Sequence, residues 1–174
     1  MPLNLSDYIT DVPDYPKPGI LFKDITPLLQ NPEAFTQCIT KLAGLYRNSE
    51  FDVIAGIESR GFIFACPLAI ELSTSFVPIR KAGKLPRKTL QAQYELEYGS
   101  EIIEIHEDAI KPDSKVLIID DVLATGGTVK AAISLVEQSG ATNIEVCTIV
   151  ELLFLQGREA VSYTHLTLPT ILLV

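Results

Sequence analysis

The sequence is poor in the residues that would point to metal binding, secretion or a membrane. Its 174 residues include no tryptophan, one methionine, two histidines and three cysteines. The cysteines are far apart in apolar surroundings, which fits neither a metal-ligand motif nor a secreted disulfide framework. No run approaches the ~20 apolar residues of a membrane span, and the N-terminus lacks the pattern of a signal peptide. We therefore expect a soluble, cytoplasmic protein with no membrane partner.

Positive charge is also scarce, and it is unevenly distributed. Fourteen lysines and arginines face 22 acidic residues, a net charge of −8, which argues against a nucleic-acid partner. Five of the fourteen lie within nine positions, namely Arg80, Lys81, Lys84, Arg87 and Lys88. Such a cluster in an acidic protein indicates a local anion site; the alternative is a solvated surface loop.

Apolar runs alternate with helical patterns along most of the chain, which predicts an α/β fold with a parallel sheet flanked by helices. Residues 1–160 have the size of one domain. Residues 1–30 are rich in proline and turn formers, so we expect an irregular arm with little regular structure. Expected strands are 51–57, 75–80, 115–120 and 143–150, and expected helices start at 32, 62 and 128.

Two segments depart from this alternation. Residues 81–106 are basic at first and then carry two strand-like runs on either side of a hairpin turn at 97–100. Residues 161–174 contain no Asp, Glu, Lys or Arg. This tail is either a terminal strand or sequence foreign to the domain, and we assign it no function.

The segment Val116–Thr128 carries the clearest chemistry. Four apolar residues predict a buried strand, and Asp120 and Asp121 follow where ligands of open α/β sheets bind. Two adjacent carboxylates there can accept hydrogen bonds from a sugar diol, directly or through a metal ion. The next turn, Ala124–Thr128, offers glycine backbone, two threonine hydroxyls and a helix N-terminus to a phosphate. The alternative is a strand ending in two solvated acids and a glycine turn.

A second, weaker anion site is readable at Glu58–Gly61. It too lies between an apolar strand and a helix, and Arg60 could form paired hydrogen bonds with a phosphate. Read alone, this Ser-Arg-Gly sequence is usually just a turn.

The whole segment Val116–Thr128 resembles the phosphoribosyl pyrophosphate motif of the type I phosphoribosyltransferases. The resemblance implies that Asp120 and Asp121 hold the ribose hydroxyls and that the following turn holds the 5′-phosphate. The residues implied for that turn are Ala124, Thr125, Gly126, Gly127 and Thr128. It also implies a small N-terminal hood that covers the base and a mobile β-ribbon loop at 81–106. The pyrophosphate residues implied are Glu58, Ser59, Arg60, Arg80, Lys81 and Lys84. By analogy with dimeric relatives, the last three are expected to reach the pyrophosphate in the neighbouring subunit's site. Members of the family often carry a cis peptide at the 58–61 loop.

Within this family, most of residues 1–160 resembles the members that use adenine. The resemblance implies that Phe22 stacks on the base, that the backbone of Leu21 and Lys23 binds its polar edge, and that Leu155 covers its other face. It assigns Glu97 to proton transfer or charge stabilisation at the purine and Tyr98 to closing the site. Alone, Glu97 reads as a surface acid.

The implied reaction joins adenine to phosphoribosyl pyrophosphate with Mg²⁺ as cofactor. The cation would arrive with the substrate, and Asp120 and Asp121 are the side chains that could contact it. By analogy with dimeric relatives we expect a homodimer. Two alternatives stay open: a phosphoribosyltransferase for hypoxanthine, guanine, xanthine or a pyrimidine, and a non-catalytic regulator that senses phosphoribosyl pyrophosphate.

Overall fold

The computed structural model describes residues 3–15, 17–95, 99–161 and 170–173. Internal contacts divide the chain into two compact units, Met1–Leu45 and Tyr46–Val174, and each is described by itself. Among the described residues, no helix is both long enough and apolar enough to cross a membrane.

The first unit has more regular structure than we expected. It contains the 3₁₀ helix η1 (Leu5–Tyr8), strands β1 (Thr10–Pro13) and β2 (Leu21–Asp24), helix α1 (Thr26–Gln30) and most of helix α2 (Pro32–Tyr46). The expectation of an irregular arm is therefore wrong. The β1 and β2 strands pair antiparallel, and the Gly19 N–H donates to Asp14 Oδ1 at 2.7 Å, which closes the turn between them. Pro13 is the last residue of β1 and Pro18 lies in the turn, so neither interrupts the ladder.

The start of α2 follows the sequence signal. The Asn31 Oδ1 accepts a 2.9 Å hydrogen bond from the Ala34 N–H, so Asn31 caps the helix that Pro32 opens.

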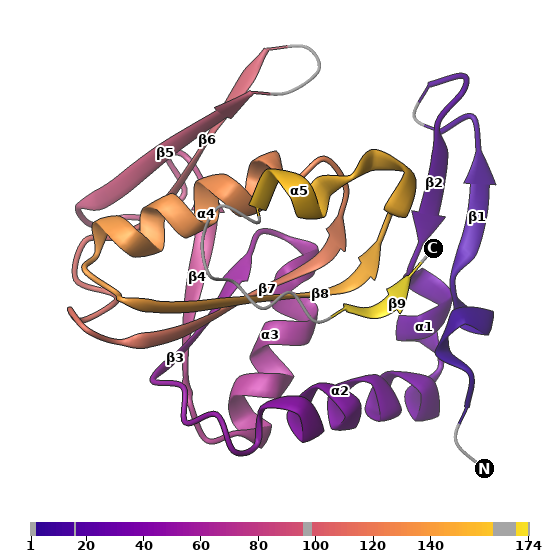
Figure 1. Ribbon diagram of the computed structural model, residues 1–174, viewed down its shortest axis with the longest axis horizontal. Helices are drawn as coiled ribbons and strands as arrows, with labels where there is room; N and C mark the ends of the chain where they lie inside the picture. The colour runs from indigo at the N-terminus through magenta and orange to yellow at the C-terminus, as the bar shows by residue number, and fades with distance from the viewer. Residues whose placement is uncertain (1–2, 16, 96–98, 162–169, 174) are drawn as a thin grey trace. The chain divides into compact units, whose positions relative to one another are not determined.

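The second unit is built on a seven-stranded sheet of order β5-β6-β4-β3-β7-β8-β9. Its parallel part comprises β4 (Ser75–Lys81), β3 (Val53–Ile57), β7 (Lys115–Leu123), β8 (Asn143–Glu151) and β9 (Thr170–Leu173). Helices α3 (Arg60–Glu71) and α4 (Gly127–Gln138) lie on opposite faces of this sheet (Figure 1). The expected fold class is confirmed. All five residues of β3 are buried, as a parallel strand covered on both faces requires.

Strands β5 (Thr89–Glu95) and β6 (Ser100–His106) form the expected antiparallel ribbon. The ribbon joins the sheet through only two pairs of β4 and β6, Arg80↔Glu104 and Lys81↔Ile103. It extends away from the rest of the sheet in Figure 1. The basic segment therefore begins where the ribbon leaves the sheet.

The chain ends with the 3₁₀ helix η2 (Leu153–Leu155), the short helix α5 (Gly157–Val161) and β9. In β9, Thr170 pairs with Thr148 of β8 in parallel register. The described end of the tail, Thr170–Leu173, is a strand, and whether the tail is native to the domain is not tested by this pairing.

Candidate active site

The two predicted acids lie near the end of β7, a central strand. The strand runs three residues beyond the predicted end at 120, because its pairing with β8 continues to Leu123↔Glu151. Asp121 is buried, with 4% of its surface exposed, so it is not the solvated strand-end acid of the alternative. The Asp121 N–H donates to Asp120 Oδ1 at 2.9 Å, which ties the first carboxylate to the backbone of the second acid.

Burial makes this pair electrostatically unusual. Burial and the adjacent Asp121 carboxylate raise the pKa of Asp120 well above its ordinary value. Burial also raises the pKa of Asp121, against the opposing effect of the nearby Arg60 guanidinium. A ligand that donates hydrogen bonds or carries positive charge would relieve both groups. A sugar diol and a divalent cation each meet that description.

The glycine turn leads into the N-terminus of α4, which is the end of a helix that favours an anion. Gly126 has φ +86°, a left-handed conformation, and α4 begins at the next residue. The helix N-terminus therefore presents unpaired backbone N–H groups next to the acids. Thr125 is exposed and Thr128 is half-buried. The predicted turn residues Ala124 to Thr128 thus lie together at one strand-to-helix junction, with Gly126 buried.

The back of this turn is packed against α5, which the sequence reasoning missed. A Cβ at Gly126 would lie 2.7 Å from the Gly157 carbonyl oxygen and 3.1 Å from Ala160 Cβ. Gly157 in turn packs on the Ala124 carbonyl. The conformation of the turn therefore depends on a segment some 30 positions later, for which the local sequence gives no signal.

The second predicted anion loop lies beside the first. Glu58 to Gly61 connects β3 to α3, and its Glu58–Ser59 peptide bond is cis. Arg60 Nε lies 2.9 Å from Asp121 Oδ2, with the geometry of an ion pair rather than a hydrogen bond. The structure thus brings the loop's arginine and the acid pair into one site, as adjacent parallel strands β3 and β7 require.

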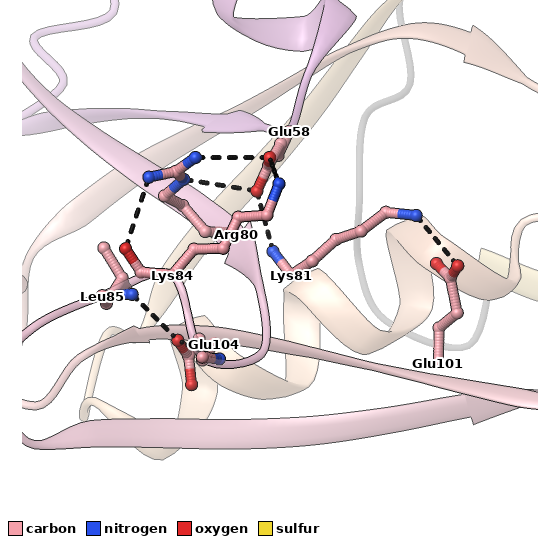
Figure 2. Close-up of polar contacts among 8 residues, drawn as sticks. Glu58, Arg80, Lys81, Lys84, Leu85, Glu101 and Glu104 are labelled. Carbon is pink, nitrogen blue, oxygen red and sulfur yellow. Dashed lines mark hydrogen bonds and ion pairs between the residues drawn. The ribbon is translucent and has the colours of Figure 1, made fainter.

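Three of the five clustered basic residues converge on Glu58. Its Oε2 accepts hydrogen bonds from Arg80 Nε at 3.2 Å and from the Lys81 N–H at 2.9 Å, while its Oε1 accepts from Lys84 Nζ at 2.9 Å (Figure 2). Although its burial opposes the change, these partners lower the pKa of Glu58 to about 2. The Arg80, Lys81 and Lys84 side chains are between one third and one half exposed, so they can still meet a ligand.

The other two basic residues of the cluster lie apart from this group. Arg87 pairs with Asp108 in an exposed contact. Arg87 and Lys88 line a separate surface hollow of about 410 Å³ with Glu107 and Asp108. The sequence cluster therefore divides, and its first three members alone gather at Glu58.

Sequence reasoning also missed the acids of β6 that organise the ribbon. Glu101 Oε1 lies 2.9 Å from Lys81 Nζ, and its Oε2 accepts a 2.7 Å hydrogen bond from Tyr94. Burial and this carboxylate raise the pKa of Tyr94 to about 12. Glu104 is 2% exposed. The sequence did contain a signal for this residue, because Glu104 lies inside the apolar run 102–105. A charged residue at such a buried position needs hydrogen-bond or charge partners.

The residues predicted to hold the base lie in both units. Phe22 is half-buried on β2 and makes an edge-to-face contact with Tyr15 at a centroid distance of 5.2 Å. Lys23 Nζ lies 2.7 Å from Asp11 Oδ1, and its neighbour Leu21 is exposed. Their roles stay predictions.

Leu155 belongs to the second unit, where it ends η2 and is 38% exposed. The segment that carries it is followed by Arg158, which makes a two-pronged contact with the buried carboxylate of Glu151. Glu97 and Tyr98, the predicted catalytic residues, lie outside the described residues.

No group of three or more His, Cys, Asp or Glu side chains suited to a metal occurs within the described ranges. The chain offers instead the two carboxylates of Asp120 and Asp121. Mg²⁺ is commonly held by one or two carboxylates plus substrate phosphates and water, so this donor set fits a cation that arrives with a phosphorylated substrate.

Comparison with known proteins gives a consistent picture. Residues 24–169 match the model of the phosphoribosyl transferase domain. The adenine phosphoribosyltransferase of Kosmotoga olearia is 56% identical over 160 residues, covering 92% of this chain and 94% of the relative. The crystal structure of adenine phosphoribosyltransferase from Thermoanaerobacter pseudethanolicus superposes with a TM-score of 0.93 at 44% identity and 98% coverage of both chains. That of the Giardia lamblia enzyme complexed with 9-deazaadenine gives 0.94 at 36% identity, covering 98% and 96%.

Proposed function

The chain belongs to the phosphoribosyltransferase family, and we propose that it transfers the 5-phosphoribosyl group from phosphoribosyl pyrophosphate to adenine. The products are AMP and pyrophosphate, as expected for purine salvage. Relatives at 56% and 53% identity over more than nine-tenths of the chain are adenine phosphoribosyltransferases, which supports adenine over another base. The single observation that carries the proposal is the contiguous acid pair and glycine turn, with Arg60 held against Asp121.

In this proposal the substrate is held at three points. Asp120 and Asp121 accept hydrogen bonds from the ribose hydroxyls. The backbone N–H groups and hydroxyls of Ala124–Thr128 bind the 5′-phosphate at the start of α4. The Glu58–Gly61 loop, through Arg60, lies next to the acids and faces the pyrophosphate. Fixing both reactants in line at C1′ can lower the barrier by roughly 7–11 kcal/mol.

The chemistry needs no protein nucleophile. Attack of adenine N9 on C1′ releases pyrophosphate through an oxocarbenium-like state, as in other glycosyl transfers. The cations Arg80, Lys81 and Lys84 stabilise the departing pyrophosphate electrostatically. When bound, Mg²⁺ supplies further charge neutralisation on the pyrophosphate. Phe22 stacks on the adenine ring in this proposal, with the backbone of its neighbours Leu21 and Lys23 reading the polar edge.

Two residues outside the described ranges complete the proposal. Glu97 transfers a proton or stabilises charge at the purine, and Tyr98 closes over the site. Water is thereby excluded as a competing nucleophile. A homodimer in the cytoplasm is part of the same proposal, supported by the resemblance to dimeric relatives. Sedimentation velocity at micromolar concentration tests the assembly, and a single species at the monomer mass of 19.1 kDa would contradict it.

The test of function is incubation of the purified chain with adenine, phosphoribosyl pyrophosphate and Mg²⁺, with AMP followed by chromatography. Hypoxanthine, guanine and xanthine are run in parallel, and a larger kcat/KM for any of them would overturn the adenine assignment. The Asp120→Asn plus Asp121→Asn variant should form no AMP. The matched control is Asp113→Asn, an exposed acid at φ +63° that asparagine tolerates, and it should keep full activity. Unchanged turnover in the double variant would refute the diol assignment.

A further inference from the structure

Glu104 is a buried carboxylate whose compensation comes entirely from neutral donors among the described residues. It lies on β6 and is 2% exposed. Its Oε1 accepts hydrogen bonds from the Gly83 N–H at 3.0 Å and the Leu85 N–H at 3.2 Å. Its Oε2 accepts from Thr89 Oγ1 and Gln91 Nε2, both at 3.2 Å. Burial alone would raise its pKa, and these four hydrogen bonds hold that pKa below the ordinary value.

A charge buried in this way is costly unless its hydrogen bonds are complete, so its partners are held firmly. Two of those partners are backbone amides on either side of Lys84. The other two lie on β5, and Glu104 itself pairs with Arg80 in the β4–β6 ladder. One side chain thus ties the turn at 83–85 to both strands of the ribbon and to the end of β4.

The turn that Glu104 holds carries the cations of the candidate site. Lys84 Nζ lies 2.9 Å from Glu58 Oε1, and the Lys84 carbonyl accepts a 3.3 Å hydrogen bond from Arg80 Nη1. In Figure 2, Glu58 contacts the Arg80 and Lys84 side chains and the Lys81 N–H, while Glu104 accepts from the Leu85 N–H. Glu104 binds the backbone on both sides of Lys84, and Glu58 binds the Lys84 ammonium itself, so the two carboxylates hold different parts of the same residue's surroundings.

We propose that Glu104 is a positioning residue that acts through the 83–85 turn to place the Lys84 ammonium and the Arg80 guanidinium for the pyrophosphate group of the substrate. The proposal rests on the proposed function. It assigns Glu104 no contact with the substrate. Its effect should therefore appear in recognition of pyrophosphate-bearing ligands, and it should disappear when Lys84 is absent.

The experiment is a double-mutant cycle on the full chain with Glu104→Ala and Lys84→Ala, measured as KM for phosphoribosyl pyrophosphate, KM for adenine and kcat. We expect Glu104→Ala to raise KM for phosphoribosyl pyrophosphate by roughly 10-fold or more, the scale of a lost charge-assisted hydrogen bond. The KM for adenine should change less than about twofold. In the Lys84→Ala background the effect of Glu104→Ala should fall several-fold, because coupled residues are not additive.

Two further variants separate positioning from general damage. Glu104→Gln retains an amide oxygen that can accept from Gly83 and Leu85, so it should stay within about threefold of the wild type. Glu107→Ala removes an exposed glutamate from the residue after β6 and should leave all constants unchanged. If Glu104→Ala does not fold, Glu104→Asp replaces it, since the shorter side chain withdraws the carboxylate while keeping its charge.

Equal increases in both KM values, or an undiminished effect of Glu104→Ala without Lys84, would overturn the proposal. Calorimetric titration with inorganic pyrophosphate and Mg²⁺ keeps this test separate from that of the proposed function. If the wild type forms no AMP, the proposed function fails. The titration of wild type, Glu104→Ala and Glu104→Gln still decides whether Glu104 positions the cations, and equal affinities for all three would reject it.

Discussion

Gly61 is the position at which the two anion loops touch, and it offers a sharp test of the site's architecture. A Cβ placed on Gly61 would lie 2.7 Å from the Ile119 carbonyl oxygen and 3.3 Å from both Cα and Oδ1 of Asp120. The first contact is with the backbone of the central strand β7, which cannot rotate away. Gly61→Ala therefore has to push α3 and its leading Arg60 away from the acid pair.

The expected cost follows from this overlap. Inserting a methyl group into close-packed backbone typically costs about 1–3 kcal/mol, and the better helix propensity of alanine returns at most about 1 kcal/mol. A net cost of about 1–2 kcal/mol, within this range, lowers Tm by about 2–8 °C at about 2–4 °C per kcal/mol for a chain of this size. Because Arg60 moves with Gly61, KM for phosphoribosyl pyrophosphate should rise as well.

The assay is thermal unfolding by circular dichroism together with steady-state kinetics. The matched control is Gly44→Ala, within α2, where an added Cβ meets nothing within 4 Å. That variant should be as stable as the wild type or more stable by up to about 1 kcal/mol. If Gly61→Ala were as stable and as active as Gly44→Ala, the close approach of the two loops would be refuted.

Three further predictions concern charged groups. The pKa of Glu58 is lowered to about 2, so its ionised form stabilises the fold above pH 4.5. The difference in unfolding free energy between wild type and Glu58→Gln, measured by urea titration, should be constant near pH 7. It should shrink as the pH falls from about 4.5 to 2. A difference that grows on acidification would contradict this sign. Removing Arg158 leaves the buried Glu151 without its two-pronged partner, so Arg158→Ala should cost about 1–3 kcal/mol of unfolding free energy. The double variant Arg158→Ala with Glu151→Gln should cost less. Equal losses of unfolding free energy in the two variants would count against the pair. Tyr94→Phe removes the hydrogen bond to Glu101 and should destabilise by about 0.5–1.5 kcal/mol, measured by chemical denaturation.

Local patterns predicted the parallel sheet and the residues of the candidate site, because each strand and the acid–glycine motif consist of contiguous residues. The apolar runs at 53–57 and 115–119 became buried strands, and Asn31 with Pro32 opened a helix as such pairs do. The acids and the glycine turn follow a single strand, so their proximity needed no knowledge of the rest of the fold. The Asp121 N–H does bond the Asp120 carboxylate, and α4 begins at Gly127 without running through Gly126.

Other features depended on contacts between distant segments. The arm at 1–30 was expected to be irregular, yet Thr10 to Asp24 forms a paired hairpin once Asp14 closes its turn. The basic cluster was treated as one group, whereas Arg87 turns to Asp108 and the first three cations turn to Glu58. Neither outcome follows from the spacing of residues along the sequence.

The sequence by itself determined which chemical groups lie together at the end of β7, because a strand that leads directly into a glycine turn places its own acids and amides locally. Only the tertiary structure decided how those groups are held. The strand register that sets Glu104 opposite Arg80, the approach of Gly61 to Ile119 and the packing of Gly157 behind Gly126 all join residues that lie more than 20 positions apart. Such contacts arise from the order of strands in the sheet, and no local pattern of residues records that order.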